Sequence, residues 1–280
     1  MPLISTGHQG EEMTTRDIEQ GFWRSDNAPW IELRTTRQSM QAYKLHQHPQ
    51  LSIGAIIDGE TVSRCGGQEY HLKPGEMIAI APEVAHSCNP LAGTPRSYHM
   101  LYIDKPWCLE QLGGEAGATL CCEHTVIRNP QLFTAFMHVI ELMKRGDTER
   151  LAYAVRELLT SLPGLTICPQ QQSEFHEMQS TLQADFTLAP TLDRLAGHYA
   201  LRKETLIRQF KQATGLTPGA WLNNARIEFA RTQLRAGGDI TEVGYQSGFA
   251  DQSHFHRTFV SYTASTPRQY ARARSISDNK

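Results

Sequence analysis

Residues 240–259 read ITEVGYQSGFADQSHFHRTF. The stretch predicts two short helices joined at Gly248, where the chain reverses and where glycine adopts a positive φ without cost. Phe255 and Phe259 are four positions apart and form the apolar side of the second helix. Its opposite side carries side chains of the kind that read base edges and phosphates, namely Gln252, Ser253, His256 and Arg257. A DNA-recognition helix has this pattern, although an ordinary surface helix can share it.

Charge is divided unevenly along the chain. Residues 190–280 contain 13 Lys and Arg against 7 Asp and Glu, whereas residues 1–189 contain 14 against 22. A basic C-terminal third on an acidic remainder predicts a polyanion-binding module joined to a domain with another role. With 280 residues, the chain is long enough for about two domains with separate cores.

The sequence contains no sign of membrane insertion or export. No apolar run approaches the ~18 residues that span a bilayer. The first residues, MPLISTGHQGEEMTTRDIEQ, are polar and acidic, unlike a secretory signal or a transit peptide. We therefore expect a cytoplasmic protein with no membrane partner.

A second unit of the same kind precedes residues 240–259. In residues 192–218, Leu206 and Phe210 recur at helical spacing, and Gly215 and Pro218 end the unit. A long helix joins the two units, so residues 174–280 are predicted to form an all-α domain. Two recognition helices on one linker helix can enter successive major grooves, about 34 Å apart. The further candidate DNA contacts are Lys203, Glu204, Ile207, Arg208, Lys211 and Arg268.

Individual roles follow from side-chain chemistry. Arg208 and Arg257 suit bidentate contacts with guanine, and Gln252 suits adenine. Ile207 offers only an apolar contact, such as one with a thymine methyl group. Either arginine could instead be paired with a carboxylate on the helix surface.

Residues 1–125 are predicted to be rich in strands. Short β-branched runs alternate with turn signals such as Gly66-Gly67 and Pro74-Gly75, with no helix between them. This pattern favours an antiparallel barrel or sandwich, and hence an α+β chain with the strands first. A barrel of this size encloses a cavity open at one end.

Three histidines mark that predicted cavity. His46 and His48 form an HxH pair, and His86 follows later. With Pro74-Gly75, Pro82 and Asn89, these positions resemble the two motifs of the cupin barrel. The resemblance implies a carboxylate ligand soon after HxH, but residues 49–53 contain none, so we favour pocket lining over a bound metal. The predicted effector pocket consists of His46, His48, His86, Tyr43, Tyr98 and Tyr102.

Residues 126–162 predict a pair of helices. Pro130 begins the first helix, Gly146 ends it, and Asp147 caps the second. The pair could cover its own domain or form a homodimer. Residues 163–173, which contain Pro163, Gly164 and Pro169, are the predicted linker.

The six cysteines contain no CxxC pair, so a zinc ribbon is not expected. In a cytosolic protein we expect inert buried thiols rather than a disulfide framework. The adjacent Cys121 and Cys122 are the one candidate for redox or soft-metal sensing.

The last hundred residues resemble the AraC/XylS transcription regulators. Three positions depart from the family pattern: Ala200 replaces a turn glycine, Arg202 a capping Ser or Thr, and Gly244 a small alanine. The matching positions are Leu195-Ala196, Leu206, Arg208, Phe210, Thr214-Gly215 and Pro218 in the first unit, and Ile240, Val243, Gly248-Phe249, Gln252-Ser253, Phe255, Arg257, Phe259, Thr266-Pro267 and Tyr270 in the second.

The resemblance implies a cupin-like effector domain at residues 1–125 and a regulator that binds double-stranded promoter DNA. It favours an activator, with RNA polymerase as an expected partner and a small molecule as effector. No catalytic set or phosphate loop is present, so we expect neither an enzyme nor a cofactor. The alternatives are a cupin metalloenzyme with an appended DNA-binding domain, and a thiol- or metal-responsive regulator.

Overall fold

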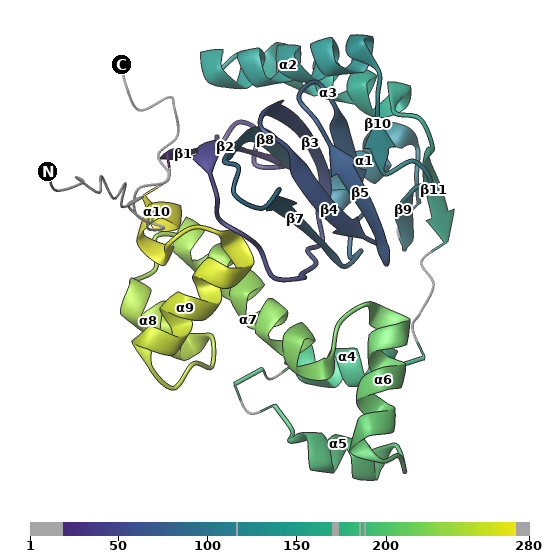
Figure 1. Ribbon diagram of the computed structural model, residues 1–280, viewed down its shortest axis with the longest axis vertical. Coiled ribbons are helices and arrows are strands. Elements are labelled where there is room, and N and C mark those ends of the chain that lie inside the picture. Colours follow the sequence, from purple (N-terminus) through teal and green to yellow (C-terminus); the bar gives the residue numbers. More distant parts are fainter. Residues whose placement is uncertain (1–18, 116, 170–173, 185, 188, 273–280) are drawn as a thin grey trace, which may run out of the picture.

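The computed structural model describes residues 19–272 except 116, 170–173, 185 and 188. The predicted boundaries at residues 1 and 280 and the end of the predicted linker therefore lie outside the described residues. Two layers of strands carry helices on their outer face, and a separate group of helices lies below them (Figure 1). The architecture agrees with the α+β prediction.

The main sheet is antiparallel and has six strands in the order β1-β2-β8-β3-β6-β10. Its centre is β8, which pairs with both β2 and β3, so that Ile103 lies beside Ile31 on one side and Leu51 on the other. The strands are β1 (Glu19–Trp23), β2 (Ile31–Ser39), β3 (Leu51–Asp58), β6 (Met77–Ile80), β8 (Arg96–Ile103) and β10 (Val126–Ile127).

A three-stranded sheet, in the order β5-β4-β7, forms the second layer. It contains β4 (Thr61–Cys65), β5 (Gln68–Leu72) and β7 (His86–Pro90). The strands thus form separate sheets rather than the closed barrel that was one of the two predicted arrangements. An isolated bridge joins His46 to His86, at the start of β7.

Helices cover the outer face of the main sheet, as Figure 1 shows for α2. They are α1 (Lys105–Leu112), α2 (Pro130–Arg145) and α3 (Thr148–Ser161). Pro130 begins α2 and Asp147 caps α3, as predicted, and Asn129 adds a side-chain cap to α2. The apolar faces of α2 and α3, including Phe136 and Val155, belong to one core with the sheet.

Part of the predicted linker is a strand. β11 (Leu165–Pro169) pairs with β9 (Ala118–Cys122), and a disulfide joins Cys121 to Cys168 across this pair. Cys65, Cys88, Cys108 and Cys122 are free thiols, but one disulfide is present that was not predicted. It pairs Cys121 with a cysteine 47 residues away rather than with its neighbour Cys122. Sequence spacing could not identify this partner, because strand pairing brings it close.

The C-terminal helices form two small cores at the two ends of α7 (Figure 1). The core around Phe210 joins α4, α5, α6 and the start of α7, and the core around Phe255 joins α8, α9, α10 and the end of α7. The helices are α4 (His176–Ala184), α5 (Leu192–His198), α6 (Lys203–Thr214), α7 (Pro218–Arg235), α8 (Ile240–Gln246), α9 (Gln252–Thr263) and α10 (Pro267–Ala271). Among the described helices, none has the length and hydropathy that a membrane crossing requires.

Candidate DNA interface and effector cavity

The second helix-turn-helix unit has the local geometry predicted from residues 240–259. Gly248 adopts φ 78° in the turn, and Phe255 and Phe259 are fully buried. Asp239 caps α8, and the Asp251 carboxylate accepts a hydrogen bond from the backbone N–H of His254 at 2.7 Å, which caps α9. The recognition helix is thus fixed at its start and along its apolar face.

The first unit reaches the same arrangement with weaker local signals. Ala200 occupies the left-handed turn position with φ 52°, where a side chain is disfavoured. Arg202 is the N-cap residue of α6 and provides no side-chain cap. Leu206 and Phe210 are nevertheless fully buried, so packing holds the helix in place.

Most of the predicted DNA contacts are on the surface. The exposed ones are Lys203, Glu204, Arg208 and Lys211 on α6, Ser253, His256 and Arg257 on α9, and Arg268 on α10, whereas Ile207 and Gln252 are partly buried. Within the described part of the chain, neither Arg208 nor Arg257 belongs to an ion pair. Among the described residues, their guanidinium groups therefore do not have the carboxylate partners that the alternative required.

Two of the side chains predicted to contact DNA interact with other groups of the protein. The Lys203 ammonium lies 2.6 Å from a carboxylate oxygen of Asp193. The amide of Gln252 donates a hydrogen bond to the carbonyl of Thr241 at 2.8 Å, which ties the start of α9 to α8. A Cβ at Gly244 would be 2.8 Å from that same amide nitrogen, so this departure from the family pattern makes room for the Gln252 side chain.

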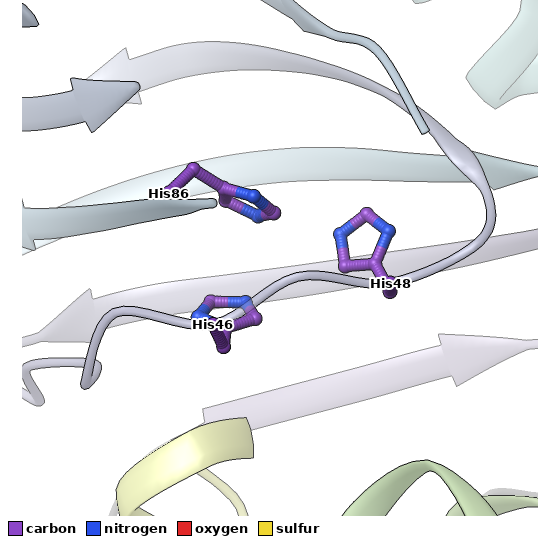
Figure 2. Close-up of side chains that lie close together, drawn as sticks. All are labelled: His46, His48 and His86. Atoms are coloured by element: carbon purple, nitrogen blue, oxygen red, sulfur yellow. The ribbon is translucent and has the colours of Figure 1, made fainter. Parts of the chain in front are cut away.

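All six residues of the predicted effector pocket line one cavity between the two layers of strands. His86 starts β7, Tyr98 and Tyr102 belong to β8, and residues 43–48 form an irregular segment. The three histidine rings approach one another from the segment and from β7, as Figure 2 shows. Sequence reasoning missed Ser52 and Arg96, which line the same cavity.

Burial and mutual repulsion favour the neutral form of the three histidines. Burial lowers the pKa of His86 to about 4. Burial, followed by repulsion from His86, holds the pKa values of His46 and His48 well below their usual range. Neutral imidazoles offer a lone pair to a metal ion or accept a hydrogen bond.

Buried charges join the strand-rich half to the second helix-turn-helix unit. Glu32 on β2 is 4% exposed and lies 2.5 Å from Arg24, 3.7 Å from Arg231 and 3.6 Å from Arg235, the last two on α7. Arg34, also on β2, donates to the carbonyls of Thr263 at 2.5 Å and Ala264 at 3.3 Å, at the end of α9. These residues were not predicted. The signal that could have found them is the alternation of Glu32 and Arg34 with the apolar Ile31 and Leu33 at the start of β2, which places both charges on one face of the strand.

The irregular segment makes further contacts with the DNA-binding helices. The backbone N–H of Lys44 donates to the carbonyl of Ser261 on α9 at 2.8 Å. Gln47 and Asn224 exchange two hydrogen bonds of 3.1 and 2.8 Å between the segment and α7. A groove of about 410 Å³ lies between residues 41–44 and the side of α9 that carries His256 and Arg257. Part of the predicted DNA-reading surface therefore faces the strand-rich half.

The remaining cysteines have low reactivity. Burial raises the pKa of the Cys122 thiol to about 12, so little thiolate forms near neutral pH. Cys121 is already in the disulfide with Cys168. The two neighbouring cysteines thus do not form the exposed low-pKa pair that is typical of a thiol sensor.

The chain matches two family models in the order of its two halves. Residues 29–162 match an AraC-like ligand binding domain, and residues 195–273 match a helix-turn-helix domain. Among curated relatives, the HTH-type transcriptional activator RhaS of Escherichia fergusonii is 38% identical over 250 residues, which cover 84% of this chain and 90% of the relative. The HTH-type regulator YbfI of Bacillus subtilis is 25% identical over 237 residues, covering 80% and 85%.

Solved structures show a similar fold over most of the chain. ToxT of Vibrio cholerae, in a crystal structure with a bound unsaturated fatty acid, aligns with a TM-score of 0.58 at 13% identity. The alignment covers 86% of this chain and 94% of ToxT. Together with the two-part match and the RhaS relative, this places a ligand-binding half before a DNA-binding half. The chain belongs to the AraC family of helix-turn-helix transcriptional regulators.

Proposed function

We propose that α6 and α9 read a specific promoter sequence and that a ligand in the histidine–tyrosine cavity controls this binding. The observation that carries the DNA-reading proposal is the placement of two exposed recognition helices at the two ends of α7. With 18 residues, α7 is about 27 Å long, which suits successive major grooves about 34 Å apart.

Arg208 and Arg257 are the proposed guanine readers. Both are exposed on the recognition helices, and neither is in an ion pair with a described residue, so each guanidinium can meet the O6 and N7 acceptors of guanine. Gln252 can read adenine only after it leaves the carbonyl of Thr241. Lys203, Lys211 and Arg268 are proposed to meet phosphates, and Glu204, Ile207, Ser253 and His256 complete the contact surface.

Control by a ligand is proposed because one segment of the chain both lines the cavity and contacts the DNA-binding half. His46, His48 and Tyr43 belong to the segment that contacts α7 and α9, so a change in the cavity reaches both helices through hydrogen bonds. A ligand that binds one arrangement of this segment more tightly shifts the population of DNA-competent molecules.

We further infer an activator that recruits RNA polymerase in the cytoplasm and has no enzymatic activity. The name of the RhaS relative, a transcriptional activator, supports the direction of regulation. The α2–α3 pair is the proposed dimer surface, because Tyr153 on α3 is a large side chain that is 68% exposed.

Duplexes selected from a random pool with the full-length protein provide the test. Fluorescence polarisation against the selected duplex and a scrambled one separates base reading from phosphate attraction. Arg257→Ala should weaken selected-site binding by about 1–3 kcal/mol, roughly 5- to 150-fold, with little change on the scrambled duplex.

Arg128→Ala is the matched control, because it removes an exposed arginine between β10 and α2, away from the recognition helices. It should bind both duplexes as the wild type does. Equal losses on both duplexes for Arg257→Ala would remove its base-reading role.

A further inference from the structure

Three imidazole nitrogens converge in the cavity. His46, His48 and His86 each offer one ring nitrogen, and these three atoms lie within 4.8 Å of one another. Tetrahedral coordination with metal–nitrogen bonds of about 2.1 Å would place such atoms ~3.4 Å apart. The three rings lie close together, as Figure 2 shows, and they would have to move closer still to bind one ion.

The other nitrogen of every ring is held by a backbone carbonyl. The Nδ1 atoms lie 2.8 Å from the Lys44 carbonyl for His46, 3.1 Å from the Gln50 carbonyl for His48, and 2.8 Å from the Val84 carbonyl for His86. A carbonyl only accepts, so Nδ1 carries the proton and the lone pair is on Nε2. Metal-binding histidines are oriented in the same way.

The converging nitrogens have few protein partners of their own. The Ser52 hydroxyl lies 3.2 Å from Nε2 of His48. Among the described residues, Nε2 of His46 and Nε2 of His86 have no hydrogen-bond partner. Two Nε2 lone pairs without a partner among the described residues, and a third beside one hydroxyl, form an incomplete set that a cation would satisfy.

The backbone that carries these rings is fixed. His46 and His86 exchange two backbone hydrogen bonds of 2.9 and 2.8 Å, and the N–H of Glu83 donates to the His48 carbonyl at 2.8 Å. Metal binding would therefore require little ordering of the chain, which favours affinity.

Size and charge narrow the class of ligand. The cavity volume is about 30 Å³, enough for an ion with a water molecule, whereas pockets for organic ligands measure about 300 Å³ or more. The positive charges of Arg34 and Arg231 act on His46 and oppose a bare dication. They favour an ion that carries an anionic fourth ligand, such as hydroxide.

We propose that His46, His48 and His86 bind one divalent first-row transition metal ion through Nε2, with its open coordination position toward the cavity. Nitrogen ligands without a carboxylate suit Zn²⁺, Co²⁺ or Ni²⁺ rather than Mg²⁺ or Ca²⁺. The metal proposal rests on the proposed function in one respect: it names the ligand of the cavity that is proposed to control DNA binding. The ion fastens residues 46–48, which contact α7, to β7.

Cobalt provides the test on the full-length protein after treatment with a chelator. Titration with Co²⁺ should produce visible d–d absorption that saturates at one equivalent and is abolished by Zn²⁺. His46→Asn should weaken Co²⁺ binding by about a hundredfold or more, whereas His138→Asn, which changes an exposed histidine on α2, should leave it unchanged. Absent d–d absorption, or equal affinity in His46→Asn, would overturn the site.

A second readout does not depend on the variants folding. Proton NMR of the Co²⁺ protein should show three paramagnetically shifted, exchangeable imidazole N–H signals, one from each protonated Nδ1. Fewer than three would overturn the three-histidine set. Binding of the chelator-treated protein to the selected duplex separates the two proposals. A protein that reads this duplex but does not bind cobalt would contradict the metal site and leave the proposed DNA reading intact.

Discussion

The two helix-turn-helix units have the same shape but are stabilised differently. The second has a glycine turn at Gly248, a capping aspartate at Asp251 and buried polar contacts with the strand-rich half. The first has Ala200 and Arg202 at the corresponding positions. It contacts that half through the apolar side chains of Leu45 and Ala85 and through the hydrogen bonds between Gln47 and Asn224, beside its core. The second unit therefore takes its shape from local signals and is joined to the strand-rich half by buried charges. The first unit depends more on packing.

This difference suggests a division of labour between the units. The hydrogen bond from Lys44 reaches Ser261 on α9 of the second unit, whereas those from Gln47 reach Asn224 on α7, beside the core of the first unit. A ligand-dependent change in this segment therefore acts on the two units through different contacts. A groove of about 660 Å³, which includes Lys211, lies between the first unit and the turn of β4 and β5. Variants that disturb one unit at a time can test this contrast.

The largest effect is expected at Glu32. Glu32→Gln leaves Arg24, Arg231 and Arg235 without their shared carboxylate, and breaking a buried pair costs about 3–5 kcal/mol. Hydrogen–deuterium exchange should rise at the end of α7 and at residues 261–264, but not in α6. Glu149→Gln, an exposed carboxylate on α3, is the control. An equal rise in both units would contradict the contrast.

The same carboxyl makes the attachment depend on pH. Burial by itself would raise the pKa of Glu32, but Arg24, Arg231 and Arg235 lower it below its usual value. A carboxyl with a lowered pKa stabilises the folded protein above its unfolded-state pKa, and this contribution is lost as the pH falls through the folded-state value. Wild-type exchange in the second unit should therefore rise in that acidic range, and Glu32→Gln should lose this dependence.

Reciprocal changes at the two turns should give intermediate, opposite effects. Gly248→Ala places a side chain at φ 78°, with Cβ 3.0 Å from the Phe186 carbonyl oxygen, and should cost about 1–2 kcal/mol. Ala200→Gly relieves the strain at φ 52° and should gain about 1 kcal/mol. Urea unfolding of the full chain measures both. A loss in Ala200→Gly would show that packing, rather than the turn, sets the stability of the first unit.

The smallest effects are expected at the helix caps. Asp251→Ala removes the bond to the N–H of His254 and should cost about 1 kcal/mol of unfolding free energy. Arg202→Ser supplies a cap that α6 does not have and should gain up to about 1 kcal/mol. The same urea experiment detects both. No gain in Arg202→Ser would mean that the N–H groups at the start of α6 are already well solvated.

The sequence by itself determined the two recognition helices. Their turns, caps and apolar stripes depend on residues within about four positions of one another, as Phe255 and Phe259 show, and such local signals can be read directly. It also identified the six residues of the cavity as candidates, because His and Tyr side chains in a strand-rich region suggest a lined pocket.

Only the tertiary structure decided which of these groups meet. His86 joins His46 and His48 through a bridge between distant segments, Cys121 pairs with Cys168 across two strands, and Glu32 meets Arg231 across the two halves. Such contacts depend on strand register and on the packing of one half against the other, which no local pattern encodes. The lone-pair directions that suggest a metal depend in turn on backbone carbonyls that only the folded chain places beside the rings.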